Sequence, residues 1–533
     1  MKLTSFRAWC VFALIICCAV GLFAQSKFLK NYSLTQTAGE TPGQPPSNSI
    51  SLITTQDLNL WLGTSKGAAK STNFGRSWEG YRSDHAFADP GIYALSTRGD
   101  TIWASTGYDK EVTDGTIQTG SGFAHSTDAG LTWKHLDQPL DRRGDSLIVY
   151  GINDSVYILP VTVPVANVTY DIALSPGTVW IASWSSGLRK RTVSDSTWQR
   201  ILLPPGNRST LSPTDTLWKY AAKDTLHRRR IFERFNPVPS ENDNLKAFGV
   251  CTVGSDTIWC GTAGGVNKST DGGVSWTRYT HESQLSSILG DWVITVREQK
   301  VHGSSRIWTT NWIKGGGNDD YAVSYTDDGG ETWKNLLVGI KAYDFAFKDT
   351  VAYIATDEGV FRTPDGGLSF TKVSYMSDPE NRQAITSPAV FSVAVLADTV
   401  YVGTGDGLAS TIDNETHRFG SAWKIFRAFQ QSGSTNLTYA YPNPFSPSSE
   451  IVRIHYGAPG GSGSSTQVNI DIFDFGMNRV RTLINNATRS GAEFDELWDG
   501  RDDHGKTVAN GTYFYRLRVE NQDPQFGKIL VLQ

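Results

Sequence analysis

An eight-residue motif recurs along the chain and limits its fold more than any other feature of the sequence. We call this motif the box. In its full form it reads Ser/Thr-x-Asp-x-Gly-x-Ser/Thr-Trp, and it occupies residues 126–133, 269–276 and 326–333. Residues 71–78 and 363–370 carry it with one or two changes, and worn copies end at Trp198 and Trp423. Copies of one motif spread along a chain predict a repeat architecture.

The residue types of the box predict a tight turn that leads into a strand. A short Asp side chain can accept backbone N–H bonds across a turn, and Gly supplies the positive φ that the turn needs. The terminal Trp starts the next strand and buries a large apolar ring. We assign this structural role to Ser126, Asp128, Gly130, Trp133, Ser269, Asp271, Gly273, Trp276, Asp328, Gly330, Trp333, Asp365 and Gly367.

Each box stands between the last two of four short strand-like segments. The first segment is apolar, and the second carries an aromatic residue at a fixed place, such as Trp61, Trp259 or Tyr353. Four short antiparallel strands per unit, repeated along the chain, are typical of a propeller blade. The sequence therefore predicts an all-β fold, with a seven-bladed β-propeller over residues 48–430.

The box resembles the Asp-box, or BNR, repeat of sialidases, photosystem assembly factors, sortilin-like receptors and some xyloglucan-degrading enzymes. The resemblance implies that each box joins the third and fourth strands of a blade and stands away from the active centre. It therefore indicates the fold much more than the function.

The start of the chain predicts export. Residues 1–24 have a basic beginning and an apolar run, which is typical of a secretory signal peptide with cleavage after Ala24. A polar leader follows at residues 25–47, and no other apolar stretch is long enough for a membrane helix. The net charge of -4 gives no reason to expect a nucleic-acid partner. We expect a protein that is exported through the periplasm and is secreted or held at the outer cell surface.

Two cysteines, Cys251 and Cys260, remain after removal of the signal peptide. If the hairpin between them turns at Ser255 and Asp256, the two cysteines face each other as a cross-strand pair. A disulfide between them suits an exported protein. Two packed thiols are the alternative.

The composition changes after residue 430. Residues 431–440 are typical of a flexible linker, and residues 441–533 alternate as the strands of a small β-sandwich. The segments 441–445 (YPNPF), 498–502 (WDGRD) and 511–515 (GTYFY) resemble those of the FlgD Ig-like domain and of the C-terminal sorting domain of type IX secretion cargo. The resemblance implies a contact with outer-membrane secretion machinery through residues 441–533, followed by cleavage or anchoring. An Ig-like spacer is the alternative.

The spacing of the boxes shows where the chain has surplus length. In an up-and-down blade, the 1–2 turn and the box emerge on one face, and the 2–3 connection and the link to the next blade emerge on the other. We call these the box face and the loop face. Loops gathered by a rigid scaffold carry function, so we place the candidate site on the loop face. The long connections are 107–122 and 311–322 within blades, and 136–168, 201–246, 279–290 and 373–389 between blades.

Few patterns in the chain point to chemistry. The histidines show no metal-ligand spacing, and Walker and Rossmann glycine patterns are missing, so we expect no metal and no cofactor. A glycosidase would need two carboxylates about 5–10 Å apart. The weak candidates on the loop face are Asp109, Glu111, Asp114, Asp319 and Asp320.

Other residues of the loop face favour binding. Tyr108, Trp184 and Trp312 follow second strands, and exposed rings of this kind stack on sugars or anchor a protein partner. Arg228, Arg229 and Arg230 could meet an anionic ligand, with an ordinary charged loop as the alternative.

The sequence therefore predicts a monomeric, non-catalytic propeller that binds a glycan or a surface or secreted protein through its loop face. One alternative is a surface glycoside hydrolase, either sialidase-like or polysaccharide-degrading. Another is an assembly factor for a membrane protein complex. The identity of the ligand stays open.

Overall fold

The computed structural model describes residues 44–532 apart from residues 82–85, 88, 90, 113–114, 193–194, 196, 207, 216–242, 284, 315–318, 381–382, 386, 428–437, 449–450, 458–465, 490–492 and 521. The predicted signal peptide, most of the leader, and Arg228, Arg229 and Arg230 lie outside the described residues. The chain divides into two compact units. Pro42–Met376 and Thr386–Phe426 belong to the first unit, and Ser377–Ile385 and Arg427–Gln533 belong to the second.

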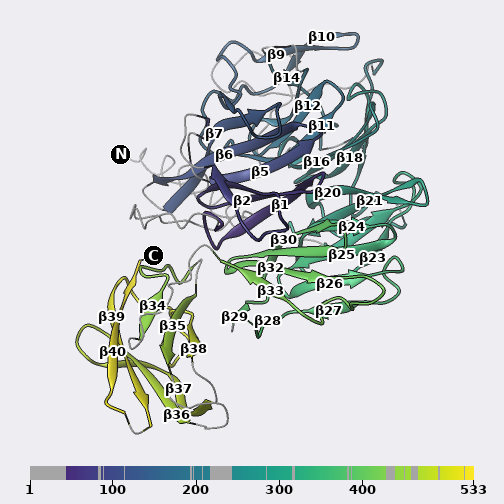
Figure 1. The fold of residues 1–533 in the computed structure, drawn as a ribbon. Coiled ribbons are helices and arrows are strands. Elements are labelled where there is room, and N and C mark those ends of the chain that lie inside the picture. Colours follow the sequence, from purple (N-terminus) through teal and green to yellow (C-terminus); the bar gives the residue numbers. More distant parts are fainter. Residues whose placement is uncertain are drawn as a thin grey trace, which may run out of the picture. The chain divides into compact units, whose positions relative to one another are not determined.

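The described part of the first unit contains seven antiparallel sheets in which strands that follow one another in sequence are neighbours (Figure 1). Sheet 1 consists of β1 (Ile50–Gln56), β2 (Asn59–Thr64), β3 (Gly67–Ser71) and β4 (Glu79–Tyr81). Sheet 2 consists of β5 (Gly91–Arg98), β6 (Thr101–Val112), β7 (Gly115–Ser126) and β8 (Lys134–Leu136). Sheet 3 consists of β11 (Thr169–Ser175), β12 (Thr178–Ser183), β13 (Gly187–Thr192) and β14 (Gln199–Arg200). Sheet 4 consists of β16 (Ala247–Val253), β17 (Thr257–Thr262), β18 (Gly265–Ser269) and β19 (Trp276–Tyr279), with β15 (Thr210–Leu211) added at its edge.

The remaining sheets follow the same order. Sheet 5 consists of β20 (Trp292–Val301), β21 (Ser304–Trp312), β22 (Ala322–Thr326) and β23 (Lys334–Leu336). Sheet 6 consists of β24 (Ala342–Lys348), β25 (Val351–Thr356), β26 (Gly359–Thr363) and β27 (Thr371–Val373). Sheet 7 consists of β30 (Val390–Leu396), β31 (Thr399–Thr404), β32 (Gly407–Ile412) and β33 (Lys424–Phe426).

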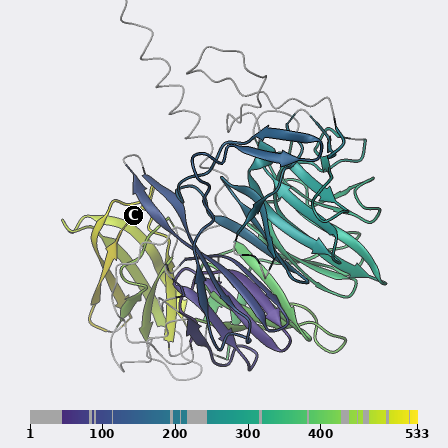
Figure 2. The ribbon, with the colours of Figure 1, turned by 90° about the horizontal axis from the view of Figure 1, so that it is seen from above.

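The sheets are arranged around a ring. The first strand of each sheet contacts the first strand of the next, and β30 of sheet 7 contacts β1 of sheet 1. Figure 2 shows the sheets from above, beside one another in sequence order from purple to green. The predicted all-β propeller fold is confirmed.

The box forms the turn before the fourth strand, with the hydrogen bonds that its residues predict. In residues 269–276, Asp271 accepts a bond from the Ser269 hydroxyl at 2.8 Å and from the Ser275 N–H at 2.8 Å, and the Gly273 N–H donates to Ser269 Oγ at 2.9 Å. The corresponding bonds recur in the boxes at 126–133, 326–333 and 363–370. In the changed copy at 71–78, Asn73 accepts the bonds in place of Asp. The side chain at this position therefore serves the turn.

Backbone contacts place the connections on two faces. The Gly272 N–H of a box donates to Asp256 O in the 1–2 turn of the same sheet, and the Ala129 N–H donates to Asp100 O. At the other end of the strands, the Ala263 N–H in a 2–3 connection donates to Lys246 O just before β16. The boxes thus lie on the box face, away from Trp184 and Trp312.

Parts of the links 136–168 and 201–246 lie away from the loop face, where we predicted them. In the link 136–168, strands β9 (Leu147–Tyr150) and β10 (Asn153–Tyr157) form a separate hairpin, and the Tyr150 hydroxyl reaches Val274 O in the box of sheet 4. In the link 201–246, β15 pairs with the outermost strand β19. The prediction that the surplus of these links gathers on the loop face is therefore wrong for β9, β10 and β15. Residues 164–166 of the first link do lie against the β6–β7 hairpin, and residues 216–242 of the second lie outside the described residues. The outermost strand of a blade is an open edge with unpaired backbone groups, which these links cover.

A repeated contact joins one sheet to the next. In sheet 1, Lys70 lies over the ring of its cross-strand neighbour Trp61, with Nζ 5.4 Å from the ring centroid, and donates at 2.8 Å to Ala129 O in the box of sheet 2. The same contact recurs with Lys190, Trp180 and Gly272 O, and with Lys268, Trp259 and Gly329 O. The box glycine also abuts the neighbouring sheet, because a Cβ on Gly130 would lie 2.6 Å from the Trp61 ring. We call this contact the seam clamp.

The predicted pairing of Cys251 with Cys260 is wrong. Val253 pairs with Thr257, so the turn contains residues 254–256, and Cys251 lies opposite Trp259 while Cys260 lies opposite Val250. Because side chains alternate along a strand, this shift of one residue turns the two thiols to opposite faces of the sheet. Both cysteines are free.

The second unit contains two antiparallel sheets around one apolar core. The strands β34 (Tyr439–Tyr441), β35 (Val452–Gly457) and β38 (Glu493–Trp498) form one sheet. The strands β37 (Arg479–Arg489), β36 (Thr466–Phe473), β39 (Gly511–Val519) and β40 (Gln525–Val531) form the other. Trp498 and Tyr515 are fully buried between them. A hairpin of β28 (Met376–Asp378) and β29 (Gln383–Ile385) precedes sheet 7 in sequence.

The described part of the chain contains no helix with the length and apolar character needed to cross a membrane.

The box carboxylates should make the stability of the protein sensitive to acid. Hydrogen bonds from Thr132 and Ser369 lower the pKa of Asp128 and Asp365 to about 2. A pKa below that of the unfolded chain stabilises the fold above about pH 4, and this contribution is lost as the pH falls toward 2. Between pH 4 and pH 2, the melting temperature of the double variant Asp128→Asn/Asp365→Asn should therefore fall less than that of the parent. Asn73 shows that an amide fits the turn. Equal losses in calorimetry would contradict this assignment.

The two thiols should react once the protein is unfolded. We expect alkylation in denaturant without reductant to label Cys251 and Cys260 in peptide maps, because their side chains face away from each other. Labelling that requires prior reduction would show a disulfide.

Candidate functional site

The most extended element of the loop face is the hairpin of β6 and β7. Its two strands pair with each other as far as Val112 and Gly115. This is well beyond the parts of β6 and β7 that pair with β5 and β8. The side chains of Tyr108 and Val112 are 41% and 40% exposed. The Ala166 N–H donates to Gln118 O at 2.9 Å, so the link that enters sheet 3 holds the base of the hairpin. Of the three aromatic residues predicted to bind a ligand, Tyr108 is the one that the structure leaves exposed.

Trp184 lies in an aromatic cluster on the same face. Its ring centroid is 5.3 Å from that of Phe248 and 6.1 Å from that of Trp292. The ammonium of Lys246 lies 5.2 Å from the centroid of Trp184, and Asp243 pairs with Lys246 at 2.7 Å. The ring is half-buried and already has a cation on it. Only part of the Trp184 side chain is therefore accessible to a partner.

Trp312 is not available to a ligand. It is 2% exposed, and its Nε1 donates to Ala342 O at 2.7 Å. Lys341 Nζ lies 4.0 Å from the ring centroid, and burial lowers the pKa of this lysine. The prediction of Trp312 as a ligand contact is wrong, because the residue closes the packing between sheets 5 and 6.

The predicted carboxylates serve local structure in the described residues. Asp319 accepts the Lys314 N–H at 2.6 Å, and Asp320 accepts the Tyr321 N–H at 2.8 Å. Asp109 lies opposite Gln118 in the β6–β7 hairpin, and the Tyr170 hydroxyl donates to Gln118 Oε1 at 2.9 Å. Glu111 is exposed near the end of β6. Contacts among these acids that would form a catalytic pair are not found in the described residues.

A ring of bulges shapes the inner strands. In each sheet, a bulge near the start of the first strand interrupts its pairing with the second strand. Examples lie between Thr169 and Asp171 and between Ala342 and Asp344. The residues at these bulges are Ser51, Tyr93, Tyr170, Phe248, Ile294, Tyr343 and Phe391, and all are buried. Some of these rings contact one another between neighbouring sheets, as Tyr170 does with Phe248 and Tyr343 with Phe391.

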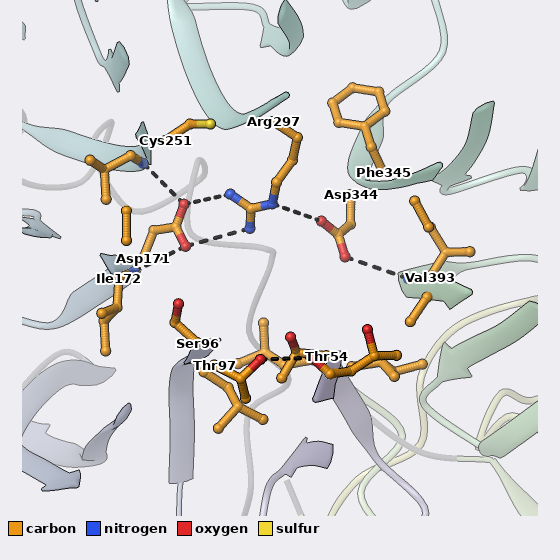
Figure 3. A pocket seen from close by; sticks show the side chains of 18 of the residues that line it. Thr54, Ser96, Thr97, Asp171, Ile172, Cys251, Arg297, Asp344, Phe345 and Val393 are labelled. Carbon is orange, nitrogen blue, oxygen red and sulfur yellow. Dashed lines mark hydrogen bonds and ion pairs between the residues drawn. The ribbon is translucent and has the colours of Figure 1, made fainter. Parts of the chain in front are cut away.

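The central channel holds a cavity of about 390 Å³ that is lined by all seven inner strands. The lining residues run from the bulges toward the 1–2 turns, as in Leu52–Thr55 and Asp344–Phe347, so the cavity occupies the box-face half of the channel. Figure 3 shows the hydroxyls of Thr54, Ser96 and Thr97 along one side and a group of charged residues along the other.

This charged group consists of Arg297 between two aspartates (Figure 3). Arg297 Nη1 lies 2.7 Å from Asp171 Oδ2, and Nε lies 3.8 Å from Asp344 Oδ1. Asp171 also accepts the Val250 N–H at 3.0 Å, and Asp344 accepts the Val393 N–H at 3.5 Å. Residues from sheets 3 to 7 thus meet across the channel. Burial lowers the pKa of Arg297, but Asp171 and then Asp344 outweigh it, and the pKa lies above its ordinary value.

The arrangement suits binding and structural support better than acid–base chemistry. Arg297 stays charged, and it neutralises a carboxylate on each side. In the described residues, groups of three or more His, Cys, Asp or Glu that could hold a metal are not found. The sequence analysis missed this charged group, although a signal for it exists. Asp171 and Asp344 each follow a Tyr at the same place in an apolar inner strand, where a charge is unexpected.

The charged group across the channel should contribute to stability. Arg297→Met leaves Asp171 and Asp344 without their cation, and we expect a loss of about 3 kcal/mol in the free energy of unfolding. The triple variant Asp171→Asn/Arg297→Met/Asp344→Asn should recover most of this loss, because no unpaired charge remains. Arg98→Met, at an exposed arginine, is the matched control and should cost less than about 0.5 kcal/mol. Urea unfolding would contradict the assignment if Arg297→Met matched the parent or the triple variant were no better than the single one.

Comparisons with solved structures find matches of low similarity. The solved structures that the chain matches include a YCF48 protein bound to a D1 peptide, at 12% identity over 76% of this chain and 100% of that one, with a TM-score of 0.38. PorZ, a surface component of the type-IX secretion system of Porphyromonas gingivalis, matches at 14% identity over 90% of this chain and 64% of that one, with a TM-score of 0.32. BamB from Moraxella catarrhalis matches at 12% identity over 68% of this chain and 96% of that one, with a TM-score of 0.36. This chain spans less than two thirds of PorZ.

No protein-family model matches the chain, and no curated protein matches it. The propeller fold rests on the ring of sheets in the chain itself.

Proposed function

We propose that this protein is an exported, non-catalytic propeller that binds another protein through its loop face. The proposal rests on the nature of the side chains that this face leaves exposed. Tyr108 and Val112 extend on one side of the β6–β7 hairpin, and Ile313 is 38% exposed just after β21. Apolar groups on a hairpin that stands out from a rigid scaffold suit a protein surface.

The surroundings of the tryptophans favour a protein over a glycan. A sugar ring stacks on an open aromatic face, but Lys246 lies over the ring of Trp184 and Lys341 over that of Trp312. A sugar would have to displace an ammonium that is already paired with the ring, and each cation–π contact of this kind is worth about 0.5–2 kcal/mol. Tyr108 alone gives a single stacking surface.

The positions of the acids do not favour a glycoside hydrolase. Asp319 and Asp320 accept backbone N–H groups near them, and Asp109 lies on β6 of another sheet. An assembly factor remains a special case of the proposed function, with a membrane protein as the partner.

Export is part of the proposal and comes from the sequence. The signal-like residues 1–24 and the resemblance of residues 441–533 to sorting domains support delivery to the cell surface by outer-membrane secretion machinery. The partner would then be a secreted or surface protein.

The proposal can be tested by site-specific photo-crosslinking on the cells that export the protein. A benzophenone amino acid at Tyr108 or Ile313 should give one discrete protein adduct, because both side chains are exposed on the loop face. The matched control is Leu131, which is 82% exposed in the box of sheet 2 and should give none.

Two results would overturn the proposal. One is an adduct from Leu131 as strong as that from Tyr108. The other is binding to a glycan array, or release of reducing sugar from a polysaccharide, without any protein adduct.

A further inference from the structure

The second unit includes a segment from the middle of the chain. Residues Ser377–Ile385, which come between sheets 6 and 7 in sequence, group with Arg427–Gln533. In this segment Asp378 is 1% exposed and Ile385 is fully buried. A segment that is only a connecting loop would keep its side chains in water.

One strand of the second unit carries a charge on a covered face. Val452, Ile454 and Tyr456 of β35 point into the apolar core, so Arg453 points away from it. An arginine on the outer face of a sheet is ordinarily in water, yet Arg453 is 2% exposed. Burial lowers the pKa of Arg453 to about 10. Something must cover the outer face of the sheet formed by β34, β35 and β38.

The β28–β29 hairpin is what covers it. Arg453 Nη2 lies 3.5 Å from Ala384 O. Arg427, which is 5% exposed, donates to Gln383 Oε1 at 2.7 Å and to Ala384 O at 2.7 Å. Tyr441 and Asp495 from the same sheet are near enough to Arg427 to favour its charge. The two arginines thus bind the backbone and amide of one short hairpin.

We propose that the outer face of the β34–β35–β38 sheet is a docking surface for the hairpin Met376–Ile385, and that this contact keeps residues 438–533 bound if the chain is cut at residues 428–437. A single cleavage at residues 428–437 then does not release residues 438–533. A protein anchored through this unit keeps its propeller after processing of the connection.

The contact has the chemistry that such a role needs. Arg453 belongs to the fragment after the cut, whereas the hairpin and Arg427 belong to the fragment before it. A buried hydrogen bond from a charged donor contributes more to binding than one between neutral groups. Because the hairpin is joined to the first unit at both ends, it presents its groups without a large loss of freedom.

The test uses the full chain with a specific protease site in place of residues 431–436. After complete cleavage, the two fragments should elute together in size exclusion at micromolar concentration. Arg453→Met should weaken this association at least tenfold, because the hydrogen bond of Arg453 to Ala384 O joins the two fragments across the cut. Arg479→Met, at an exposed arginine on β37, is the matched control and should leave the fragments together.

A second variant keeps the test valid if Arg453→Met misfolds. Replacing residues 378–384 with a Gly/Ser stretch of equal length changes only the other fragment, and it should also release residues 438–533. The proposal is overturned if the cleaved parent separates, or if this replacement leaves the fragments bound as tightly as before. Both outcomes are independent of whether the loop face binds a protein.

Discussion

The seam clamp between neighbouring sheets is the interaction on which the propeller depends. A lysine on the third strand lies on the Trp of its own sheet and donates to a backbone carbonyl in the box of the next sheet. The box must therefore present that carbonyl at a fixed place, which its internal Asp and Ser/Thr hydrogen bonds ensure. The contact joins sheet 1 to sheet 2, sheet 3 to sheet 4 and sheet 4 to sheet 5, and each hydrogen bond of this kind contributes about 1 kcal/mol.

Contacts between lysine and tryptophan also occur on the loop face. Lys246 on Trp184 and Lys341 on Trp312 use these rings for packing, and they leave the exposed apolar surface to Tyr108, Val112 and Ile313. On the box-face side, Arg297 and its two aspartates cross the central channel. The ring is thus a rigid support, and what remains for recognition is its projecting hairpin.

The sequence predicts the repeating parts of the structure well, because local rules govern them. The Asp, Gly and Trp of each box define a turn within eight residues, and Asn73 shows that the turn tolerates an amide. The pairing of Cys251 was predicted wrongly because it depends on whether a turn holds two or three residues. The candidate site could be predicted only in part. Tyr108 was found from its place on a long connection, whereas the burial of Trp312 and the meeting of Asp171, Arg297 and Asp344 depend on which sheets become neighbours.

The central claim is that the box face supports the fold while the loop face carries recognition. Hydroxyl-radical footprinting tests it most directly, by comparing the purified protein with the protein on the cells that export it. The account predicts that Tyr108 and Ile313 lose reactivity on cells, while Leu131, Leu368 and Phe370 on the box face keep theirs. Protection of the box-face residues with unchanged reactivity at Tyr108 would contradict it.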